Sequence, residues 1–411
     1  MGFHHETPRD DTPLLSKAPP LSSKSKTFAN IFISIVGSGV LGLPYSFKKT
    51  GWFMAMIMLF LVAFLTYHCM MLLVHTRRKV ESKVGFSQIN SFGDLGCAVG
   101  GTFGKFSIDA MIVLSHCGFC ASYLIFISTT LAHLAGDTSA LSSFLAPKVL
   151  FLCGCFPFQL GLNAIPTLTH LAPLSIFADV VDFAAKSIVM VEDVFVFFKN
   201  RPPLKAFGGW SMFFYGLGVA VYAFEGIGLV LPLESEAKEK DKFGRVLGVA
   251  MVFVFLLYAA FGALGYIAFG EETQGIITTN LGQGTVSALV QLGLCINLFV
   301  TFPLMMNPVY EVVERRLCDT KYCLWLRWLL VLVVCLVALL VPNFADFVSL
   351  MGSSICVILS FVFPAMFHYL VFKEELGWSC VVRDGAVVVF GLVIAVTGTW
   401  SSLMDIIAPT A

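Results

Sequence analysis

The sequence predicts an all-α polytopic membrane protein with eleven transmembrane helices, and three observations support this fold class. First, 57% of the 411 residues are hydrophobic and only 13% are charged, whereas a soluble domain carries about 25% charged residues. Second, apolar stretches of about 20 residues, the length that spans a bilayer, recur along nearly the whole chain. Third, Lys and Arg concentrate in alternate connecting segments, as expected for a multi-pass protein. The net charge of zero argues against a nucleic-acid partner.

Eleven apolar segments follow one another along the chain, and each is expected to form one transmembrane helix. They are residues 26–48, 52–75, 106–134, 147–165, 170–192, 210–232, 245–269, 284–309, 323–341, 345–371 and 382–404, in a transmembrane domain of residues 26–404. Placing the N-terminus in the cytosol puts most of the 26 Lys and Arg residues on the cytosolic side. The odd number of spans then places residues 405–411 on the opposite, lumenal side.

Residues 1–25 are polar and contain several prolines, so we expect a disordered cytosolic tail. The tail lacks the apolar core of a signal peptide. Within it, Asp10 lies four positions before Leu14 and Leu15, which is the pattern of an acidic dileucine sorting signal. Sorting adaptors read such signals and direct membrane proteins to lysosomes or vacuoles. A chance match in a short tail is the alternative interpretation.

The first apolar segment is interrupted by residues that form helices poorly. Its centre reads Gly37-Ser38-Gly39-Val40-Leu41-Gly42-Leu43-Pro44. Glycine and proline release backbone N–H and C=O groups at bilayer depth, which is tolerated only in a protein interior or beside a cavity. The match to the dinucleotide fingerprint G-x-G-x-x-G is discounted because no βαβ unit surrounds it. A broken helix of the kind that binds substrate in secondary transporters is the favoured interpretation.

The sixth segment contains a second break with the same Gly-x-Gly and Leu-Pro pattern, in residues 223–232. Breaks five spans apart indicate two five-helix repeats of inverted topology, with the eleventh span as an addition. Helix N-termini suit a carboxylate and unwound carbonyls suit an ammonium group. The expected substrate-binding residues are Gly37, Ser38, Gly39, Val40, Leu41, Phe224, Glu225 and Gly226. Two glycine-rich helix-packing motifs are the alternative.

Ionisable groups at membrane depth cost about 2.5–3.5 kcal/mol on insertion scales, so each needs a reason. Glu225 is the first candidate for carrying a proton or binding the substrate ammonium; capping of freed amides is its alternative role. Lys186 lies one helical turn after Asp182. These two form either a neutral structural pair or a protonatable group in place of a sodium ion. His68 is either a pH-sensitive group or a packing residue.

The third segment carries Asp109, His116 and Tyr123 at intervals of seven residues, which places them on one helix face. This stripe lines an aqueous path or forms a buried hydrogen-bonded seam, and both interpretations stay open. Asp109 is a further proton-coupling candidate. No cluster has metal-ligand spacing and no nucleophile–base arrangement is apparent. We therefore expect no metal, no cofactor other than the coupling proton, and no enzymatic activity.

With these motifs the sequence resembles the amino acid/auxin permease superfamily, in particular its proton-coupled amino acid transporters and plant vacuolar amino acid transporters. The likeness runs from about residue 25 to residue 400. The residues that carry it are the octapeptide 37–44, His68-Cys69-Met70, Asp109, Gly118-Phe119-Cys120, Tyr123, Phe224-Glu225-Gly226-Ile227-Gly228, Leu231-Pro232-Leu233-Glu234 and Gly265-Tyr266-Ile267-Ala268-Phe269-Gly270.

The resemblance implies the five-plus-five inverted-repeat (LeuT-like) fold and proton-coupled transport of small neutral amino acids. Together with the dileucine pattern it implies the vacuolar membrane, or tonoplast, and export from the acidic lumen to the cytosol; the plasma membrane is the less favoured location. The animal proton-coupled members carry a histidine at the position of Asn30 and cysteines that pair on the lumenal or extracellular side. This chain lacks both features, so Glu225, Asp109 and Lys186 are the proton-coupling residues to test.

Two other functions fit parts of the sequence. A membrane amino acid sensor with little or no net transport would use the same site, but the cytosolic segments are short for a signalling module. A channel would need a continuous polar lining, whereas the polar residues cluster around the two breaks.

Overall fold

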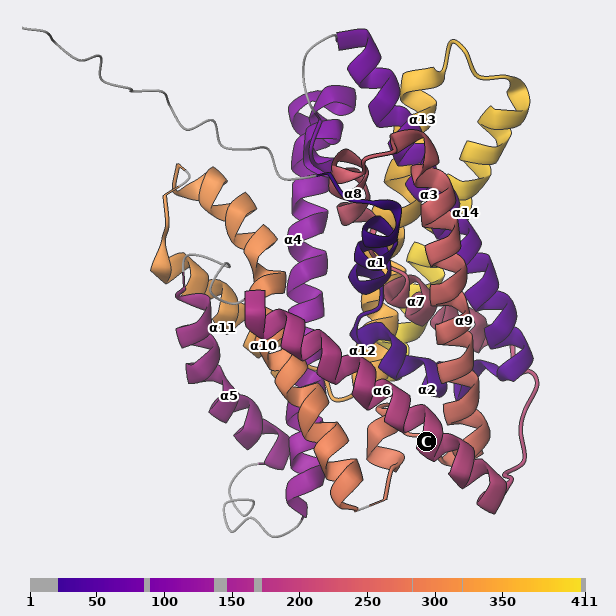
Figure 1. Ribbon diagram of the computed structural model, residues 1–411, viewed down its shortest axis with the longest axis vertical. Coiled ribbons are helices and arrows are strands. Elements are labelled where there is room, and N and C mark those ends of the chain that lie inside the picture. Colours follow the sequence, from indigo (N-terminus) through magenta and orange to yellow (C-terminus); the bar gives the residue numbers. More distant parts are fainter. Residues whose placement is uncertain are drawn as a thin grey trace, which may run out of the picture.

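The computed structural model describes residues 21–84, 89–136, 146–165, 172–282, 284–319 and 321–407. These residues form helices joined by short connections (Figure 1), and their β pairing is limited to one bridge between Ser22 and Ala237. The dileucine pattern at Asp10, Leu14 and Leu15 lies outside the described residues.

Each of the eleven predicted apolar segments is at least partly helical in its described residues, and several helices extend beyond the predicted limits. The α-helices of the described chain are α1 (Lys24–Ile35), α2 (Leu43–Thr50), α3 (Trp52–Val84), α4 (Phe92–Ala135), α5 (Pro147–Asn163), α6 (Ala172–Asn200), α7 (Trp210–Ala223), α8 (Val230–Glu236), α9 (Phe243–Phe269), α10 (Thr285–Leu317), α11 (Leu324–Leu340), α12 (Phe344–Met351), α13 (Phe363–Phe372) and α14 (Trp378–Ile407). Two π-helical segments, Gly352–Cys356 and Ile358–Val362, link α12 to α13.

Seven helices in the described ranges are long and apolar enough to cross a membrane, or eight if the bent pair α1–α2 counts as one span. Helices α5 and α11 have 17 residues each, which is the short end of the range for a crossing helix. Helix α6 is long but carries Asp179, Asp182 and Lys186 within its apolar stretch. The chain is therefore an all-helical polytopic membrane protein.

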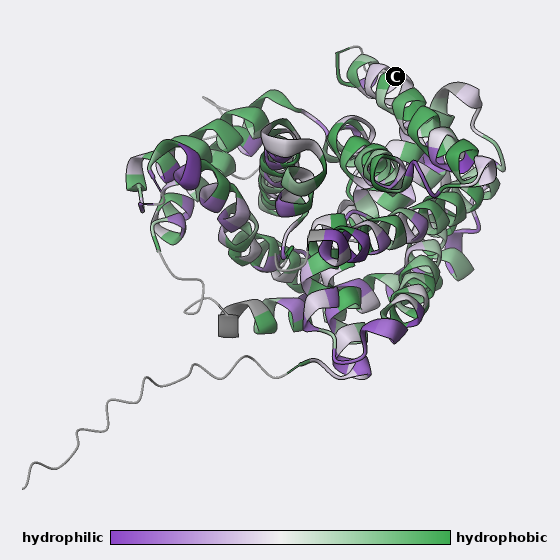
Figure 2. Cartoon of the chain, turned by 90° about the horizontal axis from the view of Figure 1, so that it is seen from above, coloured by the Kyte–Doolittle hydropathy of each residue, from purple (hydrophilic) through white to green (hydrophobic). Residues whose placement is uncertain are grey.

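The helices form two groups around a central set of broken helices (Figure 1). Helices α4, α5, α10 and α11 pack on one another on one side, and α3, α9, α13 and α14 lie on the other. Helix α6 crosses between the groups and contacts both α9 and α10. Large apolar side chains such as Phe60, Phe195 and Val396 are exposed on the periphery, where Figure 2 shows mostly hydrophobic residues. This surface suits contact with lipid.

Both predicted breaks are present. Helices α1 and α2 are separated by Val36, Gly37 and a 3₁₀ turn at Ser38–Gly42, and the span bends there by 47°. Helices α7 and α8 are separated by residues 224–229, which include a 3₁₀ turn at Ile227–Leu229. Glycine at these positions lacks the side chain that favours helical dihedrals, so the chain leaves the helix where the sequence predicts it.

Candidate functional site

A cavity of about 450 Å³ connects the two breaks. This volume lies in the usual range for small-molecule sites. Of the eight predicted substrate-binding residues, those that line it are Gly37, Ser38, Glu225 and Gly226. At its other end the cavity is lined by Ser91–Gly93, at the start of α4, and by Glu311 and Arg315, near the end of α10. The cavity therefore extends from the breaks toward the side predicted to be cytosolic.

The other four predicted residues pack behind the cavity instead of lining it. Val40 and Leu41 are buried, and the Phe224 ring contacts the Tyr258 ring with centroids 5.0 Å apart. Gly39 faces Ala223 so closely that an added Cβ would lie 2.7 Å from the Ala223 Cα. These residues bring the two broken helices together, so the packing interpretation holds for this part of each motif.

The first break presents backbone and hydroxyl groups to the cavity. The Val36 N–H still bonds to the Phe32 carbonyl at 3.0 Å, after which Gly37 is extended. The N–H groups that open a helical turn have no intrahelical partner, so the start of the 3₁₀ turn at Ser38 can accept an anionic group. The Ser38 hydroxyl lies near the hydroxyl groups of Tyr123 and Tyr222.

The second break presents Glu225. Helix α7 ends with the Phe224 N–H bonded to the Ala220 carbonyl at 3.0 Å, and Glu225 follows outside the helix. The Glu225 side chain lies close to the backbone of Ile227 and is partly exposed to the cavity. Glu225 therefore has access to a ligand in the cavity.

Lys186 joins α6 to the first break. Its Nζ lies 2.5 Å from the Asp182 Oδ2 and 3.1 Å from the Gly37 carbonyl oxygen, and both side chains are buried. The expected i,i+4 pair with Asp182 is present, and the cation also contacts an unwound carbonyl. Asp179 and Asp182 line the cavity, whereas Lys186 lies behind them.

The stripe on α4 lines the cavity with all three of its members, Asp109, His116 and Tyr123. Asp109 forms an ion pair with Arg315 of α10 at 3.0 Å. The His116 Nδ1 lies 2.9 Å from the carbonyl oxygen of Ile112 in its own helix. The stripe therefore borders an open path, and its two titratable members already have polar partners.

His68, the remaining proton-coupling candidate, is not among the residues that line the cavity. It sits beside a polar group formed by α13 and α14, in which the His368 Nδ1 lies 2.6 Å from the Asp384 Oδ2. The buried Nε2 of His68 has no hydrogen-bond partner among the described residues. His68 lies at the middle of α3, and the sequence of this almost uniformly apolar segment does not show which face of the helix meets the cavity.

Two cavity residues on α10 were missed as individual candidates. Asn297 and Thr301 line the cavity, and the Thr301 hydroxyl donates to the Asn297 Oδ1 at 2.9 Å. Polar residues at i and i+4 in an otherwise apolar segment share one helix face, and this spacing is the signal that could have identified them.

Comparison with known proteins places the chain in a family. Residues 21–404 match the family described as transmembrane amino acid transporter protein. Amino acid transporter AVT3A of Arabidopsis thaliana is 63% identical, covering 98% of this chain and 94% of its own length. Vacuolar amino acid transporter 3 of Saccharomyces cerevisiae is 28% identical over 94% of this chain and 57% of its own length.

A solved structure shares the fold. The nucleobase-cation-symport-1 family transporter Mhp1, in a closed conformation with bromovinylhydantoin bound, matches with a TM-score of 0.56 at 14% identity, covering 94% of this chain and 92% of its own. The relatives are named transporters and not enzymes, and the name of the yeast relative is consistent with the expected vacuolar membrane location. The chain belongs to the transmembrane amino acid transporter family.

Proposed function

We propose that this protein is a proton-coupled symporter that moves neutral amino acids from the vacuole lumen to the cytosol by alternating access. The observation that carries the proposal is the cavity, which reaches both helix breaks and contains an acidic side chain at the second one. Unwound backbone beside a titratable carboxylate provides groups for a zwitterion and for a proton in one place.

The substrate carboxylate would bind at the N–H groups around Gly37 and Ser38, where a helical turn begins. Its ammonium group would face Glu225 and the free carbonyls of the second break. The nearest cation, Lys186, is neutralised by Asp182. Apolar cavity walls that include Phe119 and Leu298 favour an uncharged side chain.

Glu225 is the strongest proton-coupling candidate because it faces the cavity and has no basic partner among the described residues. The Asp182–Lys186 pair ranks second, since a change in its protonation would alter the contact between Lys186 and Gly37. Asp109 ranks third because Arg315 already balances its charge. His68 ranks last because it lies away from the cavity.

The finer architecture is part of the same proposal. Eleven crossings, two inverted five-helix repeats and a cytosolic N-terminus are supported by the helical state of all eleven segments and by the two breaks five segments apart. The tail of residues 1–25 would bind sorting adaptors, residues 405–411 would lie in the lumen, and the coupling ion would be the proton.

The cavity also supports a cytosol-facing state. On the opposite side, the space between α2, α7, α12 and α14 is filled by polar contacts. These include the Tyr215 hydroxyl bonded to Asp346 at 2.9 Å, and Lys49, whose Nζ lies 3.9 Å from Asp405. Opening toward the lumen would require these contacts to separate.

The test is uptake of radiolabelled alanine by proteoliposomes that contain the purified protein under an imposed pH gradient. We expect accumulation that a protonophore abolishes. Binding without flux would favour the sensor, and flux indifferent to the gradient would remove proton coupling. In Glu225→Gln the proton dependence or the transport itself should be lost; unchanged proton-driven uptake in this variant would remove Glu225 from the mechanism.

A further inference from the structure

A single hydroxyl on α9 binds both breaks. The Tyr258 hydroxyl lies 2.9 Å from the carbonyl oxygen of Ile35, the last residue of α1, and 2.9 Å from that of Ala223, the last residue of α7. Tyr258 is completely buried and is not among the residues that line the cavity. It therefore contacts the elements that form the cavity, rather than the space itself.

The position of this hydroxyl matters because two helix C-termini meet there. The last carbonyls of a helix have no intrahelical partner, and each C-terminus carries a partial charge of about −0.5. The ends of α1 and α7 therefore repel one another in a region that bulk water does not reach. A buried carbonyl without a donor is unfavourable, and Tyr258 supplies a donor to both ends.

The hydroxyl carries one hydrogen, so the two carbonyls share it. When α1 and α7 separate, the hydrogen remains with one carbonyl and that single bond becomes stronger. The free-energy cost of separation is therefore smaller than the loss of a complete hydrogen bond. The shared hydrogen bond therefore fixes the end of α1 relative to the end of α7 and still allows the two ends to separate.

We propose that Tyr258 is a positioning residue that sets the rate at which α1 moves relative to α7 during transport. This inference rests on the proposed function, because it assigns a role in the transport cycle of the same site. Its aromatic ring is fixed by Phe224, with centroids 5.0 Å apart. Replacement by phenylalanine should therefore remove the hydroxyl and leave the ring in place.

The experiment compares Tyr258→Phe with the matched control Tyr310→Phe. Tyr310 is also a buried tyrosine, and its hydroxyl donates to the Asn163 Oδ1 at 2.7 Å, away from both breaks. Proteoliposome uptake of alanine is measured for each variant, and kcat is expressed per folded transporter determined by size-exclusion chromatography. For Tyr258→Phe we expect kcat to fall about tenfold while KM stays within about threefold, and for Tyr310→Phe we expect the wild-type kcat per folded molecule.

Three results would overturn the inference: an unchanged kcat in Tyr258→Phe, an equal fall in Tyr310→Phe, or a raised KM with normal kcat, which would assign the hydroxyl to substrate binding. Absence of flux in the wild type would instead remove the proposed function. If Tyr258→Phe does not fold, 3-fluorotyrosine at position 258 keeps the shape and makes the hydroxyl a stronger donor. Loss of the hydroxyl should lower kcat because the breaks lose their register, whereas a stronger donor should lower kcat because the breaks separate more slowly. For 3-fluorotyrosine we therefore expect a fall of about twofold at normal abundance, and an unchanged kcat would contradict the inference.

Discussion

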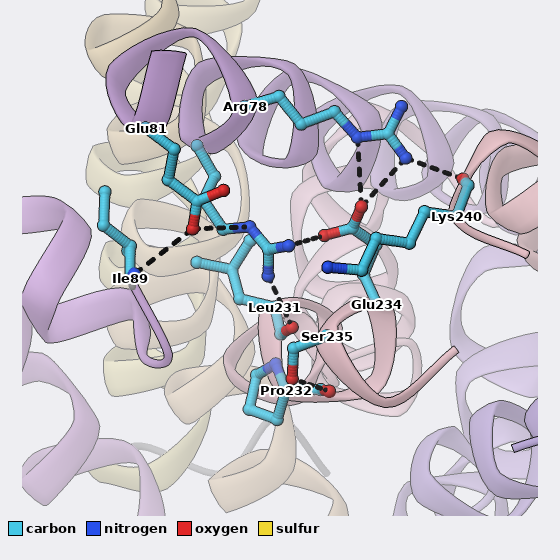
Figure 3. A network of polar contacts seen from close by, with 9 residues as sticks. Arg78, Glu81, Ile89, Leu231, Pro232, Glu234, Ser235 and Lys240 are labelled. Carbon is cyan, nitrogen blue, oxygen red and sulfur yellow. Dashed lines mark hydrogen bonds and ion pairs between the residues drawn. The ribbon is translucent and has the colours of Figure 1, made fainter. Parts of the chain in front are cut away.

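The two helices on the side of the breaks that we propose faces the cytosol are held in different ways. Helix α8 is fixed to α3 by a buried charge network (Figure 3): Glu234, with no exposed surface, forms ion pairs with Arg77 and Arg78. Arg77 also donates to the Leu231 carbonyl at 3.0 Å. Near its N-terminus α1 is held by the exposed ion pair of Lys24 with Glu239 and by a backbone bridge between the buried residues Ser22 and Ala237, neither of which is charged.

This difference indicates which half-helix moves. Separating α8 from α3 would leave charges without partners in the protein interior, and such a step is strongly unfavourable. Separating the start of α1 from the loop after α8 breaks a solvent-exposed ion pair, which contributes little, and the two backbone hydrogen bonds of Ser22. Each of those hydrogen bonds contributes about 1 kcal/mol, and no buried charge loses its partner. We therefore expect α8 to stay with α3 through the transport cycle while α1 moves.

The largest expected effect comes from the network around α8. Glu234→Gln removes the buried carboxylate that pairs with the guanidinium of Arg77 and leaves only the longer pair with the partly exposed Glu81 at 3.6 Å. Breaking a buried pair costs about 3–5 kcal/mol. The thermal midpoint of the purified protein and its abundance in the membrane should both fall sharply. Glu375→Gln is the control. Glu375 forms an ion pair with Lys79, which lies in α3 like Arg77, but this pair is at a more exposed position. Equal thermal midpoints for the two variants would show that the buried ion pairs of Glu234 stabilise the protein no more than an exposed pair does.

The second effect concerns the contact between α6 and the first break. Lys186→Met leaves Asp182 as a buried charge and should destabilise the protein by a comparable amount, about 3–5 kcal/mol. The double variant Lys186→Met/Asp182→Asn removes both charges and should recover most of that loss. A double-mutant cycle on thermal midpoints measures the coupling. Additive effects would show that the pair is not energetically linked.

A smaller change in stability should distinguish two glycines of the first break, Gly39 and Gly37. Gly39→Ala places a methyl group against the Ala223 backbone, and overpacking of this kind costs about 1–3 kcal/mol. Gly37→Ala is the matched control, since an added Cβ there meets no atom within 4 Å and its φ of −111° suits any residue. Only Gly39→Ala should lower the thermal midpoint. A lower thermal midpoint for Gly37→Ala alone would show that Gly37, and not Gly39, is the glycine required for close packing.

Local features of the fold were predictable because their causes are local. Glycine and proline at bilayer depth gave the positions of both breaks, and the length of the apolar segments gave the helices. The i,i+4 spacing gave the pair of Asp182 with Lys186. In each case the residues that act together are near one another in the sequence.

Contacts across the fold were not predictable. Asp109 pairs with Arg315 and Tyr258 reaches Ile35 because helices distant in sequence pack together. No periodicity in a single helix specifies such a partner. The same reason explains His68, whose helix turns its side chain toward α13 and α14 instead of the cavity.

The smallest expected effect lies at the start of α1. Lys24→Ala removes the exposed contact with Glu239, so the thermal midpoint should not change measurably. Hydrogen bonds from Lys242 and Lys24 lower the pKa of Glu239, so the contact is present at cytosolic pH and is lost only as the pH falls through that lowered pKa.

Hydrogen–deuterium exchange should still detect the change. Amides near the N-terminus of α1 should exchange faster in Lys24→Ala than in the wild type, because local opening requires less free energy when a tether is removed. Amides of α8 should keep their wild-type rate, since the pairs of Glu234 are intact. Faster exchange in both helices would mean that α1 and α8 open as one unit, and the difference between the two half-helices would then have no role in the transport cycle.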